Sequence, residues 1–501
     1  MTKLSSPDVL ICGAGAAGLT LAIDLARRGV AFRLIEKMNG PFPGSRGKGI
    51  QPRSQEVLED LGVLDRIVAV GGEYPVQREY LADGSYRESL MMEPVTPSPG
   101  EPYHIPLLVP QFLTERVLRG RLAELGQTVE FGQELLGFTQ DPDGVTVRLA
   151  TPAGEETLHA RYLVGADGGR SVVRHALGLG FPGKTLGVRG LVADVMVEGV
   201  GRDAWHRWSE GDMARQMALC PLSGTELFQL QAPVPLKGDV DMSASGLTRM
   251  LHERTGRDDI VVRSVAWGSA YSMNARLSDR YRVGRVLLAG DAAHTHPPTG
   301  AQGLNTSLQD AYNLGWKLAS VLDGAPDALL DSYEAERRPV AEHVLGLSTR
   351  LLDDTKRGIN RRGREVQQLD IGYSSSSLAL EMPERTGGLL AGDRAPDAPL
   401  MGAAGQRVRL FEVLKGPHWT AIGYEAAFGT GPTPRRNLHV HHVDAHGDLK
   451  DIDGHFAAAY GLVSGSWILI RPDGYVGAIV SGKHTDGLNS YLAAVGLAGN
   501  A

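Results

Sequence analysis

The feature that most constrains this chain is a glycine-rich turn placed between an apolar strand and an amphipathic helix. Asp8–Cys12 is a short apolar run, Gly13-Ala14-Gly15-Ala16-Ala17-Gly18 follows it, and Ala16–Arg28 has apolar residues at helical spacing. Phe32–Ile35 is a second apolar run, and Glu36 ends it. Glycines in such a turn permit a tight bend and let an anion approach the N–H groups that open the helix. A carboxylate at the end of the second strand can bind ribose hydroxyls, so the unit predicts a dinucleotide site.

A second glycine-rich segment, residues 285–317, favours FAD as the dinucleotide. The unit at residues 8–36 by itself fits FAD, NAD or a plain tight turn. Arg285–Ala289 has the pattern of a buried strand that ends at Gly290-Asp291, where a carboxylate can accept hydrogen bonds from a polyol chain such as ribityl. Pro297-Pro298 follows, and Gly300–Asn305 opens a helix. The N–H groups at that helix start can stabilise negative charge on a reduced flavin.

Composition and charge exclude several other classes of protein. The chain has 501 residues, which is enough for two or three domains, and its net charge of −7 argues against nucleic-acid binding. No apolar run approaches the roughly 18 residues of a membrane span, so no membrane partner is expected. The first apolar run leads into the glycine turn, which is typical of a first strand and not of a signal peptide. The two cysteines, Cys12 and Cys220, form no CxxC pair, so we expect no disulfide framework and a cytoplasmic location.

Three motifs in a fixed order carry a resemblance to a known family. They are Gly13–Gly18, the pair Asp167-Gly168 within GADGGRSVVR, and the pair Gly290-Asp291. Over residues 8–340 the sequence resembles the single-component (class A) FAD-dependent aromatic hydroxylases. That family is typified by para-hydroxybenzoate hydroxylase, phenol hydroxylase and the aromatic polyketide hydroxylases. The chain has no second GxGxxG unit, and the family likewise binds NAD(P)H transiently without a separate domain.

The resemblance implies an α/β fold with three parts. A Rossmann-like FAD-binding domain is expected from residues 1–75, 100–185 and 269–375, and an inserted antiparallel β-sheet substrate domain from residues 76–99 and 186–268. Residues 387–501 resemble the thioredoxin-like C-terminal domain of phenol and polyketide hydroxylases, at Gly392–Asp397 and at Ser466–Tyr475. The polar stretch 354–386 is expected to be a linker or boundary that few contacts cross. Because no thiol follows Cys220, we expect the tail to be structural or to form a homodimer, and not to be redox-active.

The same resemblance assigns roles to individual residues. Glu36 would bind the adenosine ribose, Arg46 the FAD, and Gln111 the ribityl region. Asp167 would lie near the FAD on the NAD(P)H path, and Asp291 would bind the ribityl chain. The full set of expected cofactor-binding residues is Gly13, Gly15, Ala16, Ala17, Gly18, Glu36, Lys37, Arg46, Gln111, Asp167, Gly290, Asp291, Pro298, Gly300, Gly303, Leu304 and Asn305. Those expected to be catalytic, because they lie over the flavin or along its edge, are Pro298, Gly303, Leu304 and Asn305.

Other polar and aromatic residues allow more than one interpretation. His294 and His296 are more often structural than catalytic in such a setting, and their i,i+2 spacing without cysteine or acidic helpers predicts no metal site. The aromatic and methionine side chains of the 186–268 lobe either line an apolar pocket or form ordinary core. They are Trp205, Trp208, Met213, Met217, Phe228 and Trp267.

The chemistry that the resemblance implies is oxygenation of a small aromatic or polyketide-like molecule. NADPH or NADH reduces FAD, O₂ then forms a flavin C4a-hydroperoxide, and an electron-rich ring attacks its distal oxygen. No acid or base is assigned, because the tyrosines, histidines and arginines of residues 186–275 carry no motif. Two alternatives stay open: a Baeyer–Villiger or epoxidising monooxygenase of the same fold, and a flavin-binding reductase or non-enzymatic protein.

Overall fold

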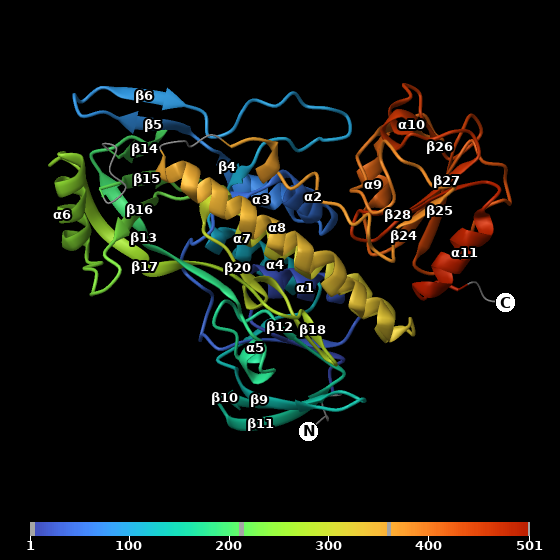
Figure 1. Ribbon diagram of the computed structural model, residues 1–501, viewed down its shortest axis with the longest axis horizontal. Coiled ribbons are helices and arrows are strands. Elements are labelled where there is room, and N and C mark those ends of the chain that lie inside the picture. The colour runs from blue at the N-terminus through green and yellow to red at the C-terminus, as the bar shows by residue number, and fades with distance from the viewer. Residues whose placement is uncertain (1–5, 210–214, 358–361, 499–501) are drawn as a thin grey trace.

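The computed structural model describes residues 6–209, 215–357 and 362–498. They form an α/β fold with three large sheets that lie side by side, and the long helix α8 (Asp331–Lys356) runs diagonally across the middle of the molecule (Figure 1). The expected fold class, a Rossmann-like FAD-binding domain with an inserted β-sheet domain and a thioredoxin-like tail, is confirmed.

The first sheet is six-stranded and holds the glycine-rich turn. Its strand order is β18-β19-β12-β1-β2-β8. Strand β1 pairs in parallel with β12 on one side and β2 on the other, and every residue of β1 is buried, which is why its sequence is a continuous apolar run. The strands are β1 (Val9–Cys12), β2 (Phe32–Glu36), β8 (Val129–Phe131), β12 (Tyr162–Gly165), β18 (Arg282–Val283) and β19 (Val286–Leu288).

Helices and two small sheets surround this parallel sheet. The helices are α1 (Ala16–Arg27), α2 (Pro52–Asp60), α3 (Leu64–Val70), α4 (Gln111–Glu124), α5 (Val172–Ala176) and α7 (Gln302–Leu322), with 3₁₀ turns η1 (Gly290–Ala292), η2 (Thr299–Ala301), η3 (Asp327–Leu330) and η4 (Arg364–Val366). The small sheets are β3 (Gly49–Ile50), β7 (Leu107–Leu108) and β4 (Gly72–Glu73), and β9 (Glu134–Gln140), β10 (Val145–Thr151) and β11 (Gly154–Ala160). The sequence predicts strands at Thr128–Phe131 and Gly144–Leu149 but not β9 or β11, each of which has four exposed residues out of seven.

The second sheet is eight-stranded and has two different faces. Its order is β20-β17-β13-β16-β15-β14-β5-β6, and one face packs on helix α6 (Ala244–Thr255) around a buried cluster that includes Leu219 and Leu230. The pairing is antiparallel except between β14 and β5, so the sheet is not purely antiparallel as expected. The strands are β5 (Val76–Tyr80), β6 (Tyr86–Ser89), β13 (Gly183–Glu198), β14 (Ala204–Trp208), β15 (Met217–Pro221), β16 (Phe228–Val234), β17 (Val261–Leu277) and β20 (His294–Thr295).

The third sheet forms the C-terminal part. Its order is β21-β28-β27-β24-β25-β26-β22-β23. Its elements are β21 (Leu380–Met382), β22 (Pro399–Gly402), β23 (Arg407–Arg409), β24 (Trp419–Tyr424), β25 (Leu438–Val443), β26 (Leu449–Lys450), β27 (Ser466–Ile470), β28 (Val476–Ser481), α9 (Leu410–Leu414), α10 (His455–Tyr460) and α11 (Thr485–Ala494). Strand β21 lies inside the stretch 354–386, so the expected linker supplies an edge strand to this sheet.

Many buried contacts join the C-terminal part to the rest, where the sequence predicts few. The guanidinium of Arg471 forms two hydrogen bonds with Glu336 of α8, at 2.7 and 2.9 Å, and all three side chains of the group Arg471, Glu336 and Lys317 are buried. Asp473 accepts a hydrogen bond from Trp316 Nε1 at 3.0 Å. The ring of Trp316 in turn packs edge-on against Trp419, with ring centroids 5.2 Å apart. The boundary is therefore a continuous core and not a flexible join.

The described residues contain no helix that is both long and apolar enough to cross a membrane. Among the same residues, no group of three histidine, cysteine, aspartate or glutamate side chains is arranged to hold a metal ion.

Candidate functional site

The glycine-rich turn leaves a helix end open for an anion. Gly13 has a φ of +105°, and a Cβ there would lie 2.4 Å from the Ala166 carbonyl oxygen, so only glycine fits. Gly18 is equally restricted, because a Cβ there would lie 1.9 Å from the Gly13 carbonyl oxygen. Gly15 differs: the nearest atom to its Cβ position is Glu115 Oε1 at 3.9 Å. Helix α1 has no side-chain N-cap, so the N–H groups of its first turn can bind a pyrophosphate.

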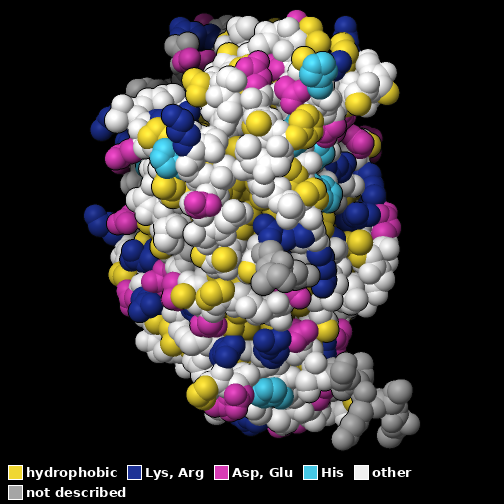
Figure 2. Space-filling model, turned by 90° about the vertical axis from the view of Figure 1, so that its right-hand side faces the viewer, with side chains coloured by type: hydrophobic (Ala, Val, Ile, Leu, Met, Phe, Trp, Pro, Cys, Tyr) yellow, Lys and Arg dark blue, Asp and Glu magenta, His cyan; other side chains and the backbone are white. Residues whose placement is uncertain are grey.

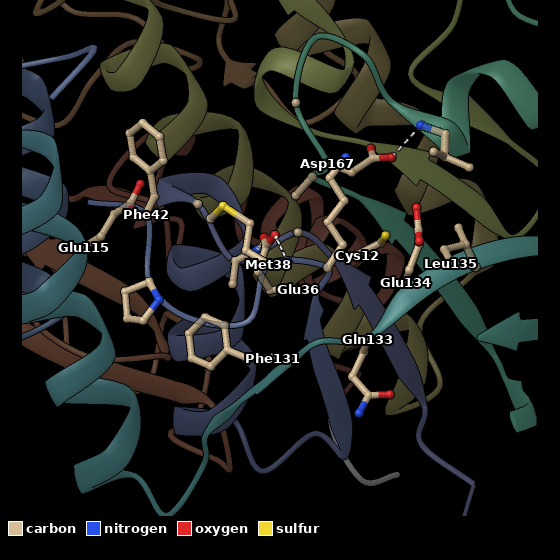
Figure 3. Close-up of a pocket in the computed structure, with 18 of the residues that line it drawn as sticks. Cys12, Glu36, Met38, Phe42, Glu115, Phe131, Gln133, Glu134, Leu135 and Asp167 are labelled. Atoms are coloured by element: carbon tan, nitrogen blue, oxygen red, sulfur yellow. Dashed lines mark hydrogen bonds between the residues drawn. The ribbon is translucent and has the colours of Figure 1, made fainter. Parts of the chain in front are cut away.

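Glu36 is fixed at the end of β2 by two backbone groups. Its Oε2 accepts a hydrogen bond from Ala14 N–H, and its Oε1 accepts one from Met38 N–H, both at 3.0 Å. Each carboxylate oxygen keeps a second lone pair for a ligand hydroxyl. Figure 3 shows Glu36 near the middle of the pocket, with the cavity residues Asp167, Glu115 and Phe131 around it. The arrangement is suited to a ribose.

One continuous pocket contains this turn and seven of the expected residues. It is lined by Cys12, Gly13, Ala14, Gly15, Glu36, Lys37, Met38, Pro41, Phe42, Arg46, Gln111, Glu115, Arg119, Phe131, Gln133, Glu134, Leu135, Ala166, Asp167, Gly168, Arg170 and Val172. Ala16, Ala17 and Gly18 belong to the adjoining first turn of α1. Gly290, Asp291, Pro298, Gly300, Gly303, Leu304 and Asn305 do not line this pocket and lie in the segment that follows β19.

Three residues of α4 line the pocket and interact with one another. Gln111 donates a hydrogen bond from Nε2 to Glu115 Oε1 at 2.8 Å, and its Oε1 accepts one from Gly47 N–H at 3.3 Å. Glu115 lies 3.8 Å from Arg119, and burial raises the pKa of its carboxyl to about 7. The sequence analysis missed Glu115 and Arg119, although they follow Gln111 at i+4 and i+8 on one helix, the spacing that places side chains on a common face.

Arg46 extends into the pocket without a protein partner. Its side chain is exposed, and it makes no hydrogen bond or ion pair with the residues that the structure describes. Its guanidinium lies 5.5 Å from the Phe42 ring centroid and 6.0 Å from that of Trp267. A cation held by ring contacts alone remains available for an anionic ligand.

Asp167 has a local structural role and one open oxygen. Its Oδ2 accepts hydrogen bonds from the N–H groups of Val172 at 2.7 Å and Val173 at 3.3 Å, which hold the start of α5 (Figure 3). Its Oδ1 is buried and has no partner among the described residues. A buried acceptor without a donor is rare in folded proteins, so this oxygen is suited to accept a hydrogen bond from a ligand.

Asp291, in the segment after β19, has an exposed side chain. Protein surrounds Asp291, and this burial raises the pKa of its carboxyl while His294 and Arg46 lower it, yet the side chain remains accessible. Gly290 precedes it with a φ of +62° and donates its N–H to Asp310 Oδ2 at 3.2 Å. Pro298 is also exposed, and Arg46 lies near enough to Asp291 to lower the pKa of its carboxyl.

The start of α7 holds the glycine segment in place. Gly300 has a φ of +81°, and Gly303 and Leu304 are half-buried. Asn305 is fully buried: its Oδ1 accepts a hydrogen bond from Gln51 N–H at 2.8 Å, and its Nδ2 donates to the Gly49 carbonyl at 2.9 Å. The Asn305 side chain therefore joins α7 to the segment after Arg46. Because both of its polar atoms are used within the protein, only the backbone of Asn305 is available to contact a ligand.

The two histidines form a chain of hydrogen bonds with Asp310. His294 is buried, with Nε2 at 2.6 Å from Asp310 Oδ2 and Nδ1 at 3.0 Å from His296 Nε2. Arg337 donates from Nε to the other oxygen of Asp310 at 2.8 Å, and both partners lower the pKa of that carboxyl. Burial and the neighbouring His294 lower the pKa of His296 well below its usual value, so His296 is neutral near pH 7. His294 fits a structural role because both its ring nitrogens are paired.

The aromatic residues of the second sheet divide between its faces. Trp208, Met217 and Phe228 belong to the cluster against α6 and are core, whereas Trp205 and Trp267 face the segment 42–48. Trp205 and Trp208 are three residues apart on one strand, so they must point to opposite sides. Met213 lies outside the described residues.

The comparisons with known proteins agree with this geometry. The family profile described as "FAD binding domain" matches residues 6–348. A flavin-dependent monooxygenase of Mycobacteroides abscessus is 43% identical over 97% of this chain and 99% of its own. The 12-dehydrotetracycline 5-monooxygenase/anhydrotetracycline 6-monooxygenase of Streptomyces rimosus is 34% identical over 97% of this chain and 98% of its own. The solved ternary complex of aklavinone-11 hydroxylase with FAD and aklavinone superposes with a TM-score of 0.83 at 27% identity, and 99% of each chain is covered.

The chain belongs to this FAD-binding family, within the class A flavin-dependent aromatic and polyketide hydroxylases. It is a FAD-dependent monooxygenase.

Proposed function

We propose that this monooxygenase hydroxylates an aromatic polyketide, with FAD held by the residues gathered around the glycine-rich turn. The observation that carries the proposal is the pocket itself. It brings an uncapped helix N-terminus, the fixed carboxylate of Glu36 and the unpartnered cation of Arg46 to one cavity. The helix N-terminus suits a pyrophosphate and the carboxylate suits a ribose, and the Arg46 guanidinium is available to donate to an anionic or carbonyl group of the cofactor. Bound FAD, once reduced by NADPH or NADH, would supply the reactivity toward O₂, and the protein would bind, orient and shield the reactants.

The residues of the protein have separable roles in this proposal. Gly13–Gly18 and Glu36 would bind the adenosine diphosphate half, with Lys37 and Asp167 beside it, and Gln111 and Asp291 the ribityl chain. Arg46, Gly290, Pro298 and residues 300–305 would enclose the flavin ring. The expected division between an FAD-binding domain and a substrate domain belongs to the same proposal. It is supported by the first and second sheets, which have separate hydrophobic cores.

The polar face of the second sheet supports a polyketide as substrate. Alternation along the strands turns Trp205, Arg207, Gln229 and Gln231 away from the α6 core, toward the side that carries Lys48. A half-buried sheet face with amide, guanidinium and indole groups is suited to a large ring system with many oxygen substituents. Relatives that are named for tetracycline intermediates and aklavinone have ligands of this kind.

The first experiment identifies the cofactor. The purified protein should be yellow and should release FAD on heating, because Glu36 and the glycine-rich turn have no role without the adenosine half. Chromatography of the released flavin checks this, and FMN, or no flavin after reconstitution, would refute the proposal.

The second experiment tests the reaction. Anhydrotetracycline, aklavinone and simple phenols are supplied with NADPH or NADH, and O₂ uptake is compared with product by mass spectrometry. Hydroxylation adds one oxygen to a ring carbon, whereas the Baeyer–Villiger alternative inserts it beside a carbonyl, which NMR of the product distinguishes. NAD(P)H oxidation without oxygenated product would favour the reductase alternative.

We also propose a cytoplasmic location and a homodimer through the C-terminal part. Both cysteines are buried and unpaired, as in a reducing compartment. Figure 2 views the molecule from its C-terminal side, where acidic, basic and hydrophobic side chains are interspersed. Large apolar side chains of this part, Phe428, Ile452 and Val463, are each more than half exposed. Sedimentation analysis of the wild-type protein and of a Phe428→Ser, Val463→Ser variant tests the dimer: a monomeric wild type would refute it.

A further inference from the structure

The segment that carries Arg46 is attached to the second sheet on both sides of that residue. Ser45 is buried and donates two hydrogen bonds to Asp194 Oδ2, from its N–H and its Oγ–H, both at 2.8 Å. Gln229 donates from Nε2 to the Ser45 carbonyl. On the other side of Arg46, Lys48 is buried and donates to Gln229 Oε1 at 2.7 Å.

Trp267 completes the attachment from the neighbouring strand. A Cβ at Gly44 would lie 2.1 Å from the Trp267 ring, so the backbone lies directly on the indole. Asp194 pairs with Trp267 of β17 and with Gln229 of β16 in the sheet register. Three adjacent strands therefore hold residues 44–48, and the one exposed side chain between the two buried ones is that of Arg46.

The buried side chain of Asp194 lowers the stability of the fold at this position. Its carboxylate is fully buried, burial raises its pKa to about 6 against the opposing effect of the Ser45 hydrogen bonds, and Oδ1 has no partner among the described residues. A buried carboxylate with one unpaired oxygen costs stability that an apolar residue would not. Residues that break the rules of stable packing in this way are expected where function requires them.

We infer that Asp194 is a positioning residue, which fixes the direction of Arg46 toward the bound cofactor by holding Ser45. The inference rests on the proposed function, because it takes the pocket as the FAD site and Arg46 as a cofactor contact. Its consequence is that the sheet proposed to bind substrate and the segment proposed to contact FAD move as one unit. A substrate that shifts β13 would shift Arg46 with it.

The test measures FAD affinity of the apoprotein by fluorescence and the visible spectrum of the bound flavin, in single and double variants. Arg46→Ala should weaken FAD binding about tenfold, the usual result of losing one charged hydrogen bond. Asp194→Ala and Ser45→Ala should weaken it severalfold and change the flavin spectrum in the same direction. In the Arg46→Ala background the same two substitutions should have no further effect, because their action passes through Arg46.

Two control variants and one substitute variant keep the test decisive. Asp194→Asn keeps an acceptor for Ser45 and should retain most of the wild-type affinity. His206→Ala removes a buried polar residue of the same sheet, whose partners Tyr80 and the Gly201 carbonyl lie away from the segment, and should lower thermal stability with no change in the flavin spectrum. If Asp194→Ala does not fold, Ser45→Ala carries the measurement.

Two results would overturn the inference while leaving the proposed function intact. The first is a loss of thermal stability in Asp194→Ala and Ser45→Ala with wild-type affinity and spectrum. The second is a loss of affinity that adds fully to that of Arg46→Ala. A wild-type protein that binds no FAD would refute the proposed function and this inference together.

Discussion

Glu115 should make FAD binding depend on pH around neutrality. Its carboxyl lies in the pocket beside Gly15, and burial raises its pKa to about 7 in the free protein. Gln111 and Arg119 lower that pKa, and Glu36 raises it. A pyrophosphate bound at the start of α1 would bring further negative charge toward this group, so the protonated carboxyl is the form compatible with tight binding.

The sign and the size follow from this raised pKa. Below pH 7 the carboxyl is mostly protonated and FAD binds well, and as pH rises through 7 the carboxyl ionises and repels the pyrophosphate. The protonated fraction falls from about nine-tenths at pH 6 to about one-tenth at pH 8, so the apparent dissociation constant should rise about tenfold. Binding should also take up a proton, because the bound anion raises the pKa of Glu115 further.

The assay is a fluorescence titration of the apoprotein with FAD at pH 6, 7 and 8 and constant ionic strength. Glu115→Gln should bind FAD about equally at all three values and about tenfold more tightly than wild type at pH 8. Glu124→Gln is the matched control on the same helix, where the exposed carboxylate pairs with Arg66 and Arg121, and it should retain the wild-type pH dependence. Equal wild-type affinity at pH 6 and 8, or a pH dependence that survives in Glu115→Gln, would refute the reasoning.

Other changes follow from the same structure. Asp291→Ala should weaken FAD binding about tenfold or more, since a charged acceptor contributes about 1.5–3 kcal/mol, and an unchanged dissociation constant would count against this ribityl contact. Arg471→Met leaves Lys317 as the only charged partner of the buried Glu336 among the described residues and should lower the free energy of unfolding by about 3–5 kcal/mol in urea titrations, whereas Arg436→Met, on an exposed side chain, should change it by less than about 0.5 kcal/mol. A chain that ends at residue 386 should lose both solubility and FAD affinity, and a truncated protein with wild-type FAD affinity would show that the tail contributes nothing to α7.

The glycine-rich unit could be predicted from the sequence because all its determinants are local. Strand, turn and helix follow one another within residues 8–36, and Glu36 lies at the strand end where the pattern places it. The pocket residues of α4 could not be predicted in the same way. The helix itself is evident from residues 112–125, but only the packed structure shows that its Gln111 end, with Glu115, lies beside the turn at Gly15.

Strand alternation explains the main difference in the second sheet. The sequence alone does not distinguish Trp205 from Trp208. In the structure Trp205 faces Lys48, whereas Trp208 packs in the α6 core. The register of β14 decides this, and the register depends on partners far away in the sequence, including the parallel strand β5. Helix α6 was not predicted either, although Leu247 and Leu251 lie four residues apart and Ser243 and Gly256 cap its ends, because the surrounding segment was interpreted as strands throughout.

The contacts of the C-terminal part show why a polar stretch in a sequence is a poor guide to a domain boundary. Arg471 and Glu336 are separated by 135 residues, so composition gives no sign that they pair in the interior. The partners of the tail on α7, Tyr312, Asn313 and Trp316, lie on the helix whose first turn carries Gly303 and Asn305. A helix held rigidly in its middle also has a fixed N-terminus. A tail without thiols can therefore act on the proposed flavin site by holding α7, and its contribution should be seen in flavin affinity and not in redox chemistry.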